Sequence, residues 1–519
     1  MTNEIDIKKE RLIDYALYVL FLSIIFVILF FCCKLSGYSS IEEIHLNGFR
    51  NMLGILVTSE AAIFALVVSV SLITIQLAAS SYSVRIIDLF LEDSYFKNTI
   101  FIFILLILYE LFLLVGIQYK LLEQYIDLLL ASTYISAIIL FYFLVLYIEN
   151  TMNLLKPNML LDTLERKTVL WTISKDDQPG DENDLLLPIT DMIIGSLKRY
   201  DESTFRYGIE KLKRILINLI NNNKTNINRH RMRYFIAYHL NHLIRLAIER
   251  RDEYATNSLF LNAGRIGEAA IETDDLEEIT LEILDLFKKF GKVSAKQKLS
   301  LVISETPSII EDIGLCAMKN KSIESSRNRV RNLKKIMYNS SYLLKKIAIE
   351  AIEIDVYAGA YYSAESLNRI GDSAISHSFE TETLEAAGNL ADIGERLIQH
   401  YSQNSGRFQS IRDINHIEEK ATIESIIYNI AKNLGRIGTS SAERNWEGAA
   451  KITAIGLTSI GREAIDHDLE RYVIDTLLES LENIREEASK QGLREALQVC
   501  SMKIDFLNDR IESISKRSM

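Results

Sequence analysis

The sequence predicts an all-α protein: four transmembrane helices, then a cytoplasmic α-helical repeat domain built as a HEAT-like solenoid or a bundle. Three observations predict this fold class. Four long apolar segments all lie before Lys156. Beyond Pro188, only Pro307 interrupts a sequence whose apolar residues recur at helical spacing. A short motif centred on an Ile-Gly pair returns several times in that second half.

The four apolar segments each reach the ~18–20 residues that a helix needs to cross the hydrocarbon core of a bilayer. They cover residues 12–33, 53–79, 98–117 and 128–148, and no comparable segment follows in the 519-residue chain. We therefore expect a multi-pass membrane protein whose four-helix transmembrane domain occupies residues 1–156.

The first apolar segment has the basic flank of a signal peptide, with Lys8, Lys9 and Arg11 before it. Its apolar run is longer than that of a typical signal sequence, and no small-residue cleavage site follows it. We expect an uncleaved anchor.

Basic residues are distributed unevenly around the four segments. With four spans, both chain ends lie on one side of the membrane, and that side carries most of the basic residues. Because cytoplasmic loops carry an excess of Lys and Arg, we expect a cell-membrane protein with both termini in the cytoplasm. That side holds Lys8, Lys9, Arg11, Arg85, Lys97, Lys156, Arg166 and Lys167, and the opposite side holds Lys34, Arg50 and Lys120.

The composition changes after the fourth segment. Three of the four prolines fall between residues 157 and 188, and the acidic stretch 174–188 predicts a loop. We expect residues 157–204 to form a linker and juxtamembrane segment, and residues 205–519 to form the helical-repeat domain.

Glycines mark the repeats at a regular distance. Gly371 and Gly394 are 23 residues apart, as are Gly438 and Gly461, and each follows an isoleucine. A helix and its turn fill ~23 residues, so a helical pair recurs about every 46, near the HEAT-like period. The glycines predict close helix packing. Helix C-caps are the alternative, although the apolar pattern continues past each glycine.

The second apolar segment carries more polar residues than a lipid-facing helix can use. At about 100° per residue they form two stripes on opposite sides of the helix. Since unpartnered polar groups are costly in hydrocarbon, at least one stripe must face protein or water. Either the hydroxyl residues pack against other helices, or one stripe lines a hydrated path. One stripe contains Ser69, Gln76, Ser80 and Ser83, and the other contains Glu60, Ser71, Thr74, Ser81 and Arg85.

Two carboxylates lie within apolar segments, Glu60 near the start of the second and Glu110 inside the third. An ionisable side chain inside a membrane segment is a functional candidate, because burying it is costly. A pore, an ion site and a proton path are the functional interpretations. A structural ion pair is the alternative for both groups, and a position at the membrane interface is a further alternative for Glu60.

A family resemblance rests on residues around the end of the second segment. They are Gln76-Leu77-Ala78, the Ser80-Ser81 pair, Ser83 with Arg85, and Phe90 followed by Asp93. With them, residues 70–114 resemble the prokaryotic membrane proteins grouped as domain of unknown function 2254. Members often have proline where this chain has Val84. The resemblance extends loosely over the first 150 residues, and it implies a multi-pass membrane protein without an established reaction or ligand.

Arg229, Arg231 and Arg233 are candidates for binding an anionic ligand such as a lipid headgroup or a nucleotide. The alternative is a basic surface paired with nearby acids, which the net charge of −11 favours. The same acidic balance argues against nucleic-acid binding. His239 and His242 have a spacing that suits a shared metal, but no further ligand completes a motif.

No phosphate-binding loop, nucleophile elbow or zinc-protease motif occurs in the sequence. The four cysteines predict neither a disulfide framework nor a metal site. We expect no catalytic residue, no cofactor, no resident metal and no enzyme activity.

Two functions from different classes fit these observations. The first is a homo-oligomeric channel or ion-conducting protein, whose polar second helix lines the path and whose cytoplasmic domain assembles the oligomer or senses a ligand. The alternative is a membrane-anchored helical-repeat scaffold that binds a cytoplasmic protein partner, as repeat proteins commonly do. The lipid bilayer is a partner in both, and an ion or small ligand is a partner in the first.

Overall fold

The computed structural model describes residues 43–82, 87, 94–119, 126–174, 186–221, 233, 235–273, 276–324, 326–405 and 414–518. The regular structure in these ranges is helical, and no strand occurs in them. The all-α fold class is therefore confirmed for the described residues. The chain divides into two compact units, Met1–Thr163 and Leu164–Met519.

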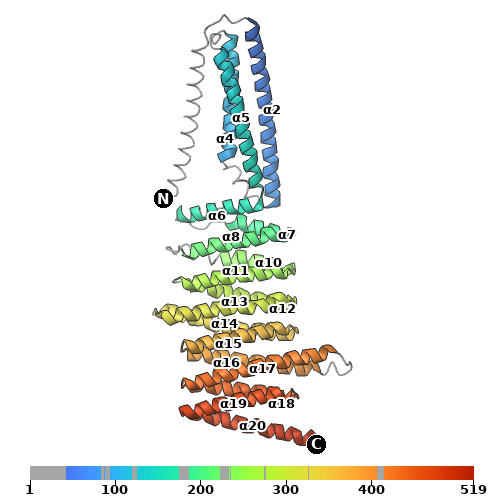
Figure 1. The fold of residues 1–519 in the computed structure, drawn as a ribbon, viewed down its shortest axis with the longest axis vertical. Helices are drawn as coiled ribbons and strands as arrows, with labels where there is room; N and C mark the ends of the chain where they lie inside the picture. The colour runs from blue at the N-terminus through green and yellow to red at the C-terminus, as the bar shows by residue number, and fades with distance from the viewer. Residues whose placement is uncertain are drawn as a thin grey trace. The chain divides into compact units, whose positions relative to one another are not determined.

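The first unit, here called the membrane unit, contains three long apolar helices (Figure 1). They are α2 (Glu43–Ser81), α4 (Ser94–Gln118) and α5 (Ile126–Leu154). Each holds a stretch long and apolar enough to cross a membrane, namely Asn47–Ser80, Phe96–Gln118 and Leu129–Asn153. Three of the four predicted apolar segments are therefore helices of membrane-crossing length. The predicted span at residues 12–33 lies outside the described residues.

The three membrane helices pack through a small set of buried side chains. Phe49 and Leu53 of α2 form a buried cluster with Leu113 and Ile117 of α4. Many of the other large apolar side chains on these helices are exposed. This is the expected surface of a unit surrounded by lipid, because acyl chains are as apolar as the side chains that they contact.

The predicted linker, residues 157–204, contains two helices. α6 (Pro157–Ser174) begins with proline, which suits a first helical position because its missing N–H has no partner there. α7 (Leu186–Arg199) buries Ile189, Met192 and Ile193. The division between the two units falls inside α6, so the predicted domain boundaries stay a prediction.

The second unit, here called the helical array, stacks its helices one after another (Figure 1). After α7 come α8 (Glu202–Asn221), η3 (Ile236–Leu240), α10 (Asn241–Glu249), α11 (Glu253–Glu272), α12 (Glu277–Lys296), α13 (Ser300–Ile323), α14 (Arg327–Glu353), α15 (Tyr357–Ser376), α16 (Glu380–Ser405), α17 (Ile414–Glu443), α18 (Glu447–Asp466), α19 (Arg471–Gln491) and α20 (Arg494–Ser518).

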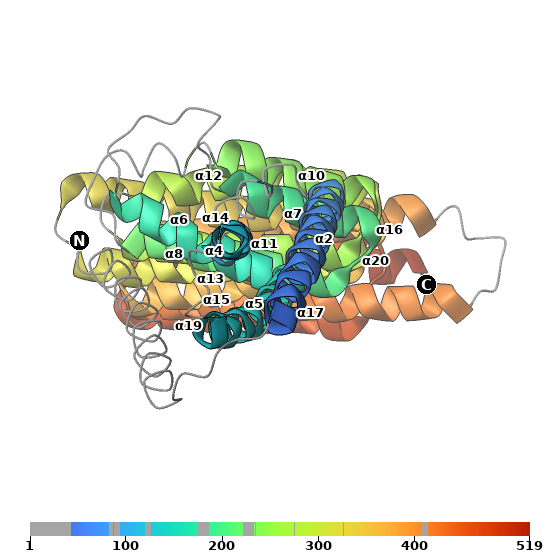
Figure 2. The ribbon, with the colours of Figure 1, turned by 90° about the horizontal axis from the view of Figure 1, so that it is seen from above.

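The helices of the array lie in two layers. Each helix packs mainly on the next helix in the chain and on the one after it. As a result α11, α13, α15, α17 and α19 form one layer, and α12, α14, α16, α18 and α20 form the other. Viewed along the stack, α12 and α14 lie on the opposite side from α13 and α15 (Figure 2). This is a helical-repeat arrangement, as predicted.

The recurring glycines lie where helices of the same layer approach closely. A Cβ on Gly371 would lie 3.0 Å from Cδ1 of Ile437, and a Cβ on Gly394 would lie 2.7 Å from Cδ1 of Ile460. Helices α15 and α16 continue past these glycines. The packing interpretation is therefore confirmed at both positions, and the C-cap interpretation is wrong.

Several helices of the array end on a non-glycine residue in the left-handed conformation. After Lys298, whose φ is 58°, the Leu299 N–H donates to the Ser294 carbonyl at 3.0 Å. This is a Schellman-type helix end, at which glycine is the usual residue. The sequence therefore carries no glycine signal at these ends. The same conformation occurs at Arg251, Asp355, Ser378, Asn445 and Asp468.

Candidate functional site

The structure separates the two polar stripes of α2. Glu60 and Ser71 of one stripe are buried, at 4% and 2% exposure, and Thr74 is half-buried. This stripe packs against α4 and α5. The other stripe, formed in the described residues by Ser69, Gln76 and Ser80, is exposed on the surface of the three-helix unit. Ser83 and Arg85, which complete the two predicted stripes, lie outside the described residues.

The hydroxyls of Ser69, Ser71 and Ser80 have partners. Ser69 Oγ donates to the Ala65 carbonyl at 2.8 Å, and Ser80 does the same to a carbonyl one turn back. Ser71 hydrogen bonds across to the Tyr147 hydroxyl of α5. These contacts are the packing use of small hydroxyl residues in membrane helices.

The exposed stripe lies toward one end of the membrane-crossing segments. Phe64 of α2 packs against Phe103 of α4, and α2 runs antiparallel to α4. Toward this end, Gln76 is twelve residues from Phe64 on α2, and the α4 span ends at Phe96, only seven residues from Phe103. Gln76 therefore extends five residues, or about 7.5 Å along the helix axis, beyond the end of the α4 span. Its predicted role in a pore stays a prediction.

The two intramembrane carboxylates, which the sequence did not connect, lie together between α2 and α4. Glu110 is fully buried, and its carboxyl group contacts that of Glu60. In the described part of the chain, no donor reaches either oxygen of Glu110 or Oε2 of Glu60. Glu60 lies inside the apolar stretch Asn47–Ser80 of α2. We call Glu60 and Glu110 the carboxyl pair.

Apolar side chains flank the carboxyl pair along the helices. One turn from Glu60, the rings of Phe64 and Phe103 pack with centroids 5.6 Å apart. On the other side of the pair, Leu53 and Leu113 belong to the buried apolar cluster. The pair therefore occupies an apolar stretch of the α2–α4 interface.

The carboxyl pair lies near the middle of the membrane-crossing segment. The α4 span runs from Phe96 to Gln118, so its midpoint is residue 107. Glu110 is three residues beyond it, which corresponds to about 4.5 Å along the helix axis. Both carboxyl groups therefore lie in the central part of the apolar stretches.

Two tyrosines that form hydrogen bonds between the membrane helices were missed in the sequence. The Tyr109 and Ser132 hydroxyls are hydrogen bonded at 2.7 Å between α4 and α5. Tyr147 bonds Ser71 and stacks obliquely on Phe96, with ring centroids 6.2 Å apart. The sequence signal that could have identified them is a tyrosine hydroxyl within an otherwise apolar segment.

The chemistry of the carboxyl pair follows from its surroundings. Two ionised carboxylates in contact, buried among apolar side chains, would be strongly unfavourable. The pair is compatible with the membrane interior when it carries a proton or a bound cation. Among the described residues, no ion pair relieves this charge. The structural ion-pair alternative therefore finds no support in the described part of the chain.

The predicted anion site is only partly described. Arg229 and Arg231 lie outside the described residues. Arg233 forms ion pairs with Glu282 at 2.6 Å and with Glu278 at 3.1 Å. These contacts agree with the alternative interpretation, a basic surface paired with nearby acids.

His239 and His242 do not face the same way. His239 is buried and stacks on Phe235 with ring centroids 5.2 Å apart, whereas His242 is exposed. Within the described ranges, no group of three or more His, Cys, Asp or Glu side chains gathers as metal ligands do. The expected absence of enzyme activity and of a cofactor stays a prediction.

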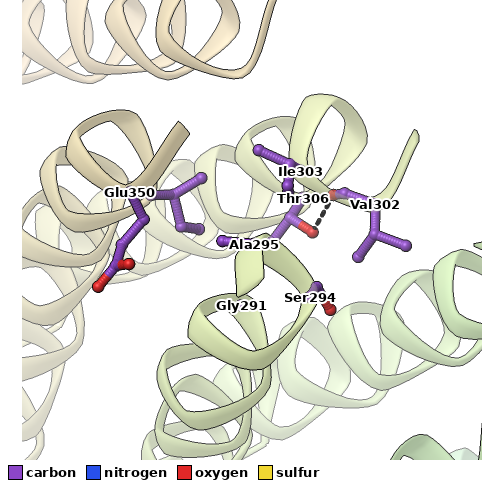
Figure 3. A pocket seen from close by; sticks show the side chains of 8 residues that line it. Gly291, Ser294, Ala295, Val302, Ile303, Thr306 and Glu350 are labelled. Carbon is purple, nitrogen blue, oxygen red and sulfur yellow. Dashed lines mark hydrogen bonds between the residues drawn. The ribbon is translucent and has the colours of Figure 1, made fainter. Parts of the chain in front are cut away.

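A small cavity lies in the helical array between α12, α13 and α14 (Figure 3). Its volume is about 10 Å³, enough for at most one water molecule. The buried Ser294 hydroxyl, which has no partner in the described residues, lines this cavity together with Gly291 and Thr306. The cavity suits a buried water and is too small for a metabolite.

Comparison with known proteins bears on the membrane unit. Residues 10–246 match the family model described as "Predicted membrane protein (DUF2254)". This match agrees with the family resemblance that residues 70–114 indicated in the sequence. The match extends beyond the first 150 residues that the sequence resemblance covered, and it includes α7 and α8 of the helical array. The chain is therefore a membrane protein, with the lipid bilayer as its surroundings.

No curated protein matches the chain. Among solved structures, one described as a "Circular tandem repeat protein with novel repeat topology and enhanced subunit contact surfaces" is similar with a TM-score of 0.39 and 11% sequence identity. The alignment covers 89% of this chain and 98% of that chain.

Proposed function

We propose that this chain is an ion-conducting membrane protein, with the carboxyl pair as its ion-binding site inside the bilayer. One observation carries the proposal. Two carboxyl groups near the middle of apolar helices contact each other, without a donor among the described residues. A buried ionisable group is costly in a membrane and marks ion or proton pathways in membrane proteins.

The proposal includes four spans with both termini in the cytoplasm and a homo-oligomeric assembly. The basic residues around the apolar segments support this orientation. The exposed stripe of α2 supports association of copies, because Gln76 offers an amide that can hydrogen bond across a helix interface. The helical array then serves as the cytoplasmic assembly or sensor domain.

The test is ion flux through the purified full-length protein in liposomes. We expect flux in the wild-type protein and a loss of about tenfold or more in Glu110→Gln, an effect of roughly 1.4 kcal/mol or more. Glu149→Gln is the matched control, because Glu149 is an exposed glutamate of α5 in the same unit. It should conduct like the wild type.

Three outcomes would contradict the proposal. The first is the absence of flux for every ion tested with the wild-type protein. The second is unchanged flux in both Glu60→Gln and Glu110→Gln, which would show that the carboxyl pair is not on the path. The third is a loss of flux in Glu149→Gln as large as in Glu110→Gln, since the effect would then not depend on the pair.

A scaffold function is the second candidate, and a surface of α14 favours it. Tyr338 and Tyr342 stack with ring centroids 6.3 Å apart. The ammonium groups of Lys288, Lys345 and Lys346 each lie within 6 Å of the Tyr342 ring centroid. This cationic aromatic surface stands out in an acidic chain and would suit an acidic protein segment.

The scaffold candidate is tested by charge reversal at two exposed lysines of this surface. In the full-length protein, Lys288→Glu with Lys346→Glu should abolish binding of an acidic partner and leave ion flux unchanged. The Glu110→Gln variant should show the reverse. Partner binding that survives the charge reversal would exclude this surface.

A further inference from the structure

The oxygen atoms around the carboxyl pair distinguish between a metal cation and a proton. Divalent cations such as Ca²⁺ take about six to eight oxygen ligands, and Mg²⁺ takes about six. Glu60 and Glu110 together offer four carboxyl oxygens. No third acidic side chain joins them in the described residues. The pair alone is an incomplete shell for a divalent cation.

The hydroxyl groups of Tyr109, Ser132 and Ser71 have other partners. The Tyr109 and Ser132 hydroxyls bond each other, and Ser132 also donates to the Leu129 carbonyl at 2.8 Å. Ser71 is eleven residues from Glu60 on α2, which is roughly 16 Å along the helix. These hydroxyls have partners of their own between α4 and α5 or between α2 and α5.

A proton needs only what the carboxyl pair supplies. When one group is protonated, its O–H can donate to the carboxylate of the other. Such a hydrogen bond to a charged acceptor is short and strong. The single remaining negative charge is then spread over both groups. A second proton would neutralise the pair entirely. This neutral form has the lowest desolvation cost among the apolar side chains of Phe64, Phe103 and Leu113.

We infer that the ion taken up by the carboxyl pair is a proton, held between Glu60 and Glu110. This inference rests on the proposed function and specifies its ion. Uptake forms one O–H bond at a carboxylate oxygen, and release to water breaks that bond. No electron moves and no co-reactant is needed. Movement of the proton along the pair requires only that the O–H donor and the acceptor exchange roles.

The first experiment compares proton flux with sodium flux in liposomes containing the full-length protein. An internal pH-sensitive dye reports proton flux under a potential set by potassium and valinomycin. We expect proton flux that does not depend on sodium and that falls about tenfold or more in Glu60→Gln and Glu110→Gln. Glu149→Gln should retain it.

The outcomes of this experiment separate the inference from the proposed function. Sodium flux without proton flux, abolished by Glu110→Gln, would overturn the inference and leave the proposed function standing. The absence of any flux in the wild-type protein would overturn the proposed function. The inference about proton binding is then decided by a second measurement.

The second measurement is labelling by a hydrophobic carbodiimide, which adds to protonated carboxyl groups in apolar surroundings. With wild-type protein in nanodiscs, we expect adducts at Glu60 or Glu110 by mass spectrometry. Labelling should decrease as the pH is raised and should not change when sodium is added. Protection by sodium at constant pH, or labelling at Glu149 in place of the pair, would overturn the inference whatever the flux assay gives.

Discussion

Gly394 and Gly388 lie on the same helix, α16, in different surroundings. A Cβ on Gly394 would lie 2.7 Å from Cδ1 of Ile460, whereas nothing lies within 4 Å of a Cβ on Gly388. We predict that Gly394→Ala lowers the free energy of unfolding by about 1–3 kcal/mol through overpacking. Gly388→Ala should raise it by up to ~1 kcal/mol through helix propensity.

Chemical denaturation followed by circular dichroism measures both glycine effects. Adding Ile460→Val to Gly394→Ala should recover part of the loss, because it removes the methyl group that Gly394 faces. Equal effects of Gly394→Ala and Gly388→Ala would show that the close approach between α16 and α18 is not what stabilises the array.

The thiols of the array are held in their neutral form. Burial raises the pKa of Cys316 to about 12 and that of Cys500 to about 11. We predict that neither thiol is alkylated at neutral pH until the array unfolds, because the thiolate is the reactive species. Peptide mapping after iodoacetamide treatment, with and without denaturant, measures this. Rapid alkylation of Cys500 under native conditions would contradict it.

At the scale of the element, helix ends in the left-handed conformation offer a stability test. Lys298 is exposed at φ 58°, and Lys296 is exposed in the last turn of α12. A left-handed conformation costs a non-glycine residue about 1–2 kcal/mol. We predict that Lys298→Gly stabilises the array by about 0.5–1 kcal/mol, after the entropic cost of glycine is subtracted.

Lys296→Gly is the matched control for the helix end. It should destabilise the array by up to ~1 kcal/mol, because glycine is unfavourable inside a helix. Thermal unfolding of both variants gives the comparison. If the two substitutions shift the melting temperature in the same direction, the left-handed conformation of Lys298 is not the cause of the stability change in Lys298→Gly.

Glu311 joins α13 to α15 and makes the stability of that contact depend on pH. It accepts from Ser366 Oγ at 2.8 Å and pairs with Arg369 at 3.2 Å. Burial is the main cause that raises its pKa above the usual value of 4.5, and these two partners oppose the rise. The folded state therefore holds the proton of Glu311 more tightly than the unfolded state does.

The sign of the effect follows from this proton balance. Stability contributed by Glu311 is complete below pH 4.5, and it is lost as the pH rises toward the higher folded pKa. We predict that wild-type protein loses stability relative to Glu311→Gln over that interval. Glu495, whose pKa is lowered by Lys451, is the control of opposite sign, because its contribution is lost as the pH falls. Denaturant titrations at several pH values measure both.

At the scale of the whole molecule, local patterns in the sequence predicted more than long-range ones. Apolar length alone located α2, α4 and α5, and the spacing of Gly371 and Gly394 indicated helix packing. The contact between Glu60 and Glu110 was not predictable, because it depends on how two antiparallel helices align across a loop. The helix end at Lys298 was also missed, because left-handed lysine has no distinctive sequence signal.

The two-layer packing predicts how the array responds to truncation. Gly438 of α17 meets Ile484 of α19, and Gly461 of α18 meets Leu507 of α20. Removal of residues 471–519 should therefore weaken α17 and α18, while α11 keeps all its neighbours. Hydrogen exchange of the truncated chain should show lost protection mainly in α17 and α18. Uniform loss through the array would indicate that it folds as one cooperative unit.

The same packing makes the array a mechanical element. Because α20 and α19 pack on fewer helices than those in the middle of the array do, a force applied at the C-terminus should detach them first. The chain would then detach in steps of a helical pair, about 46 residues each. Each step would release roughly 150 Å of extended chain. Under tension the array would thus lengthen in steps, and the helices nearest the membrane unit in sequence would unfold last.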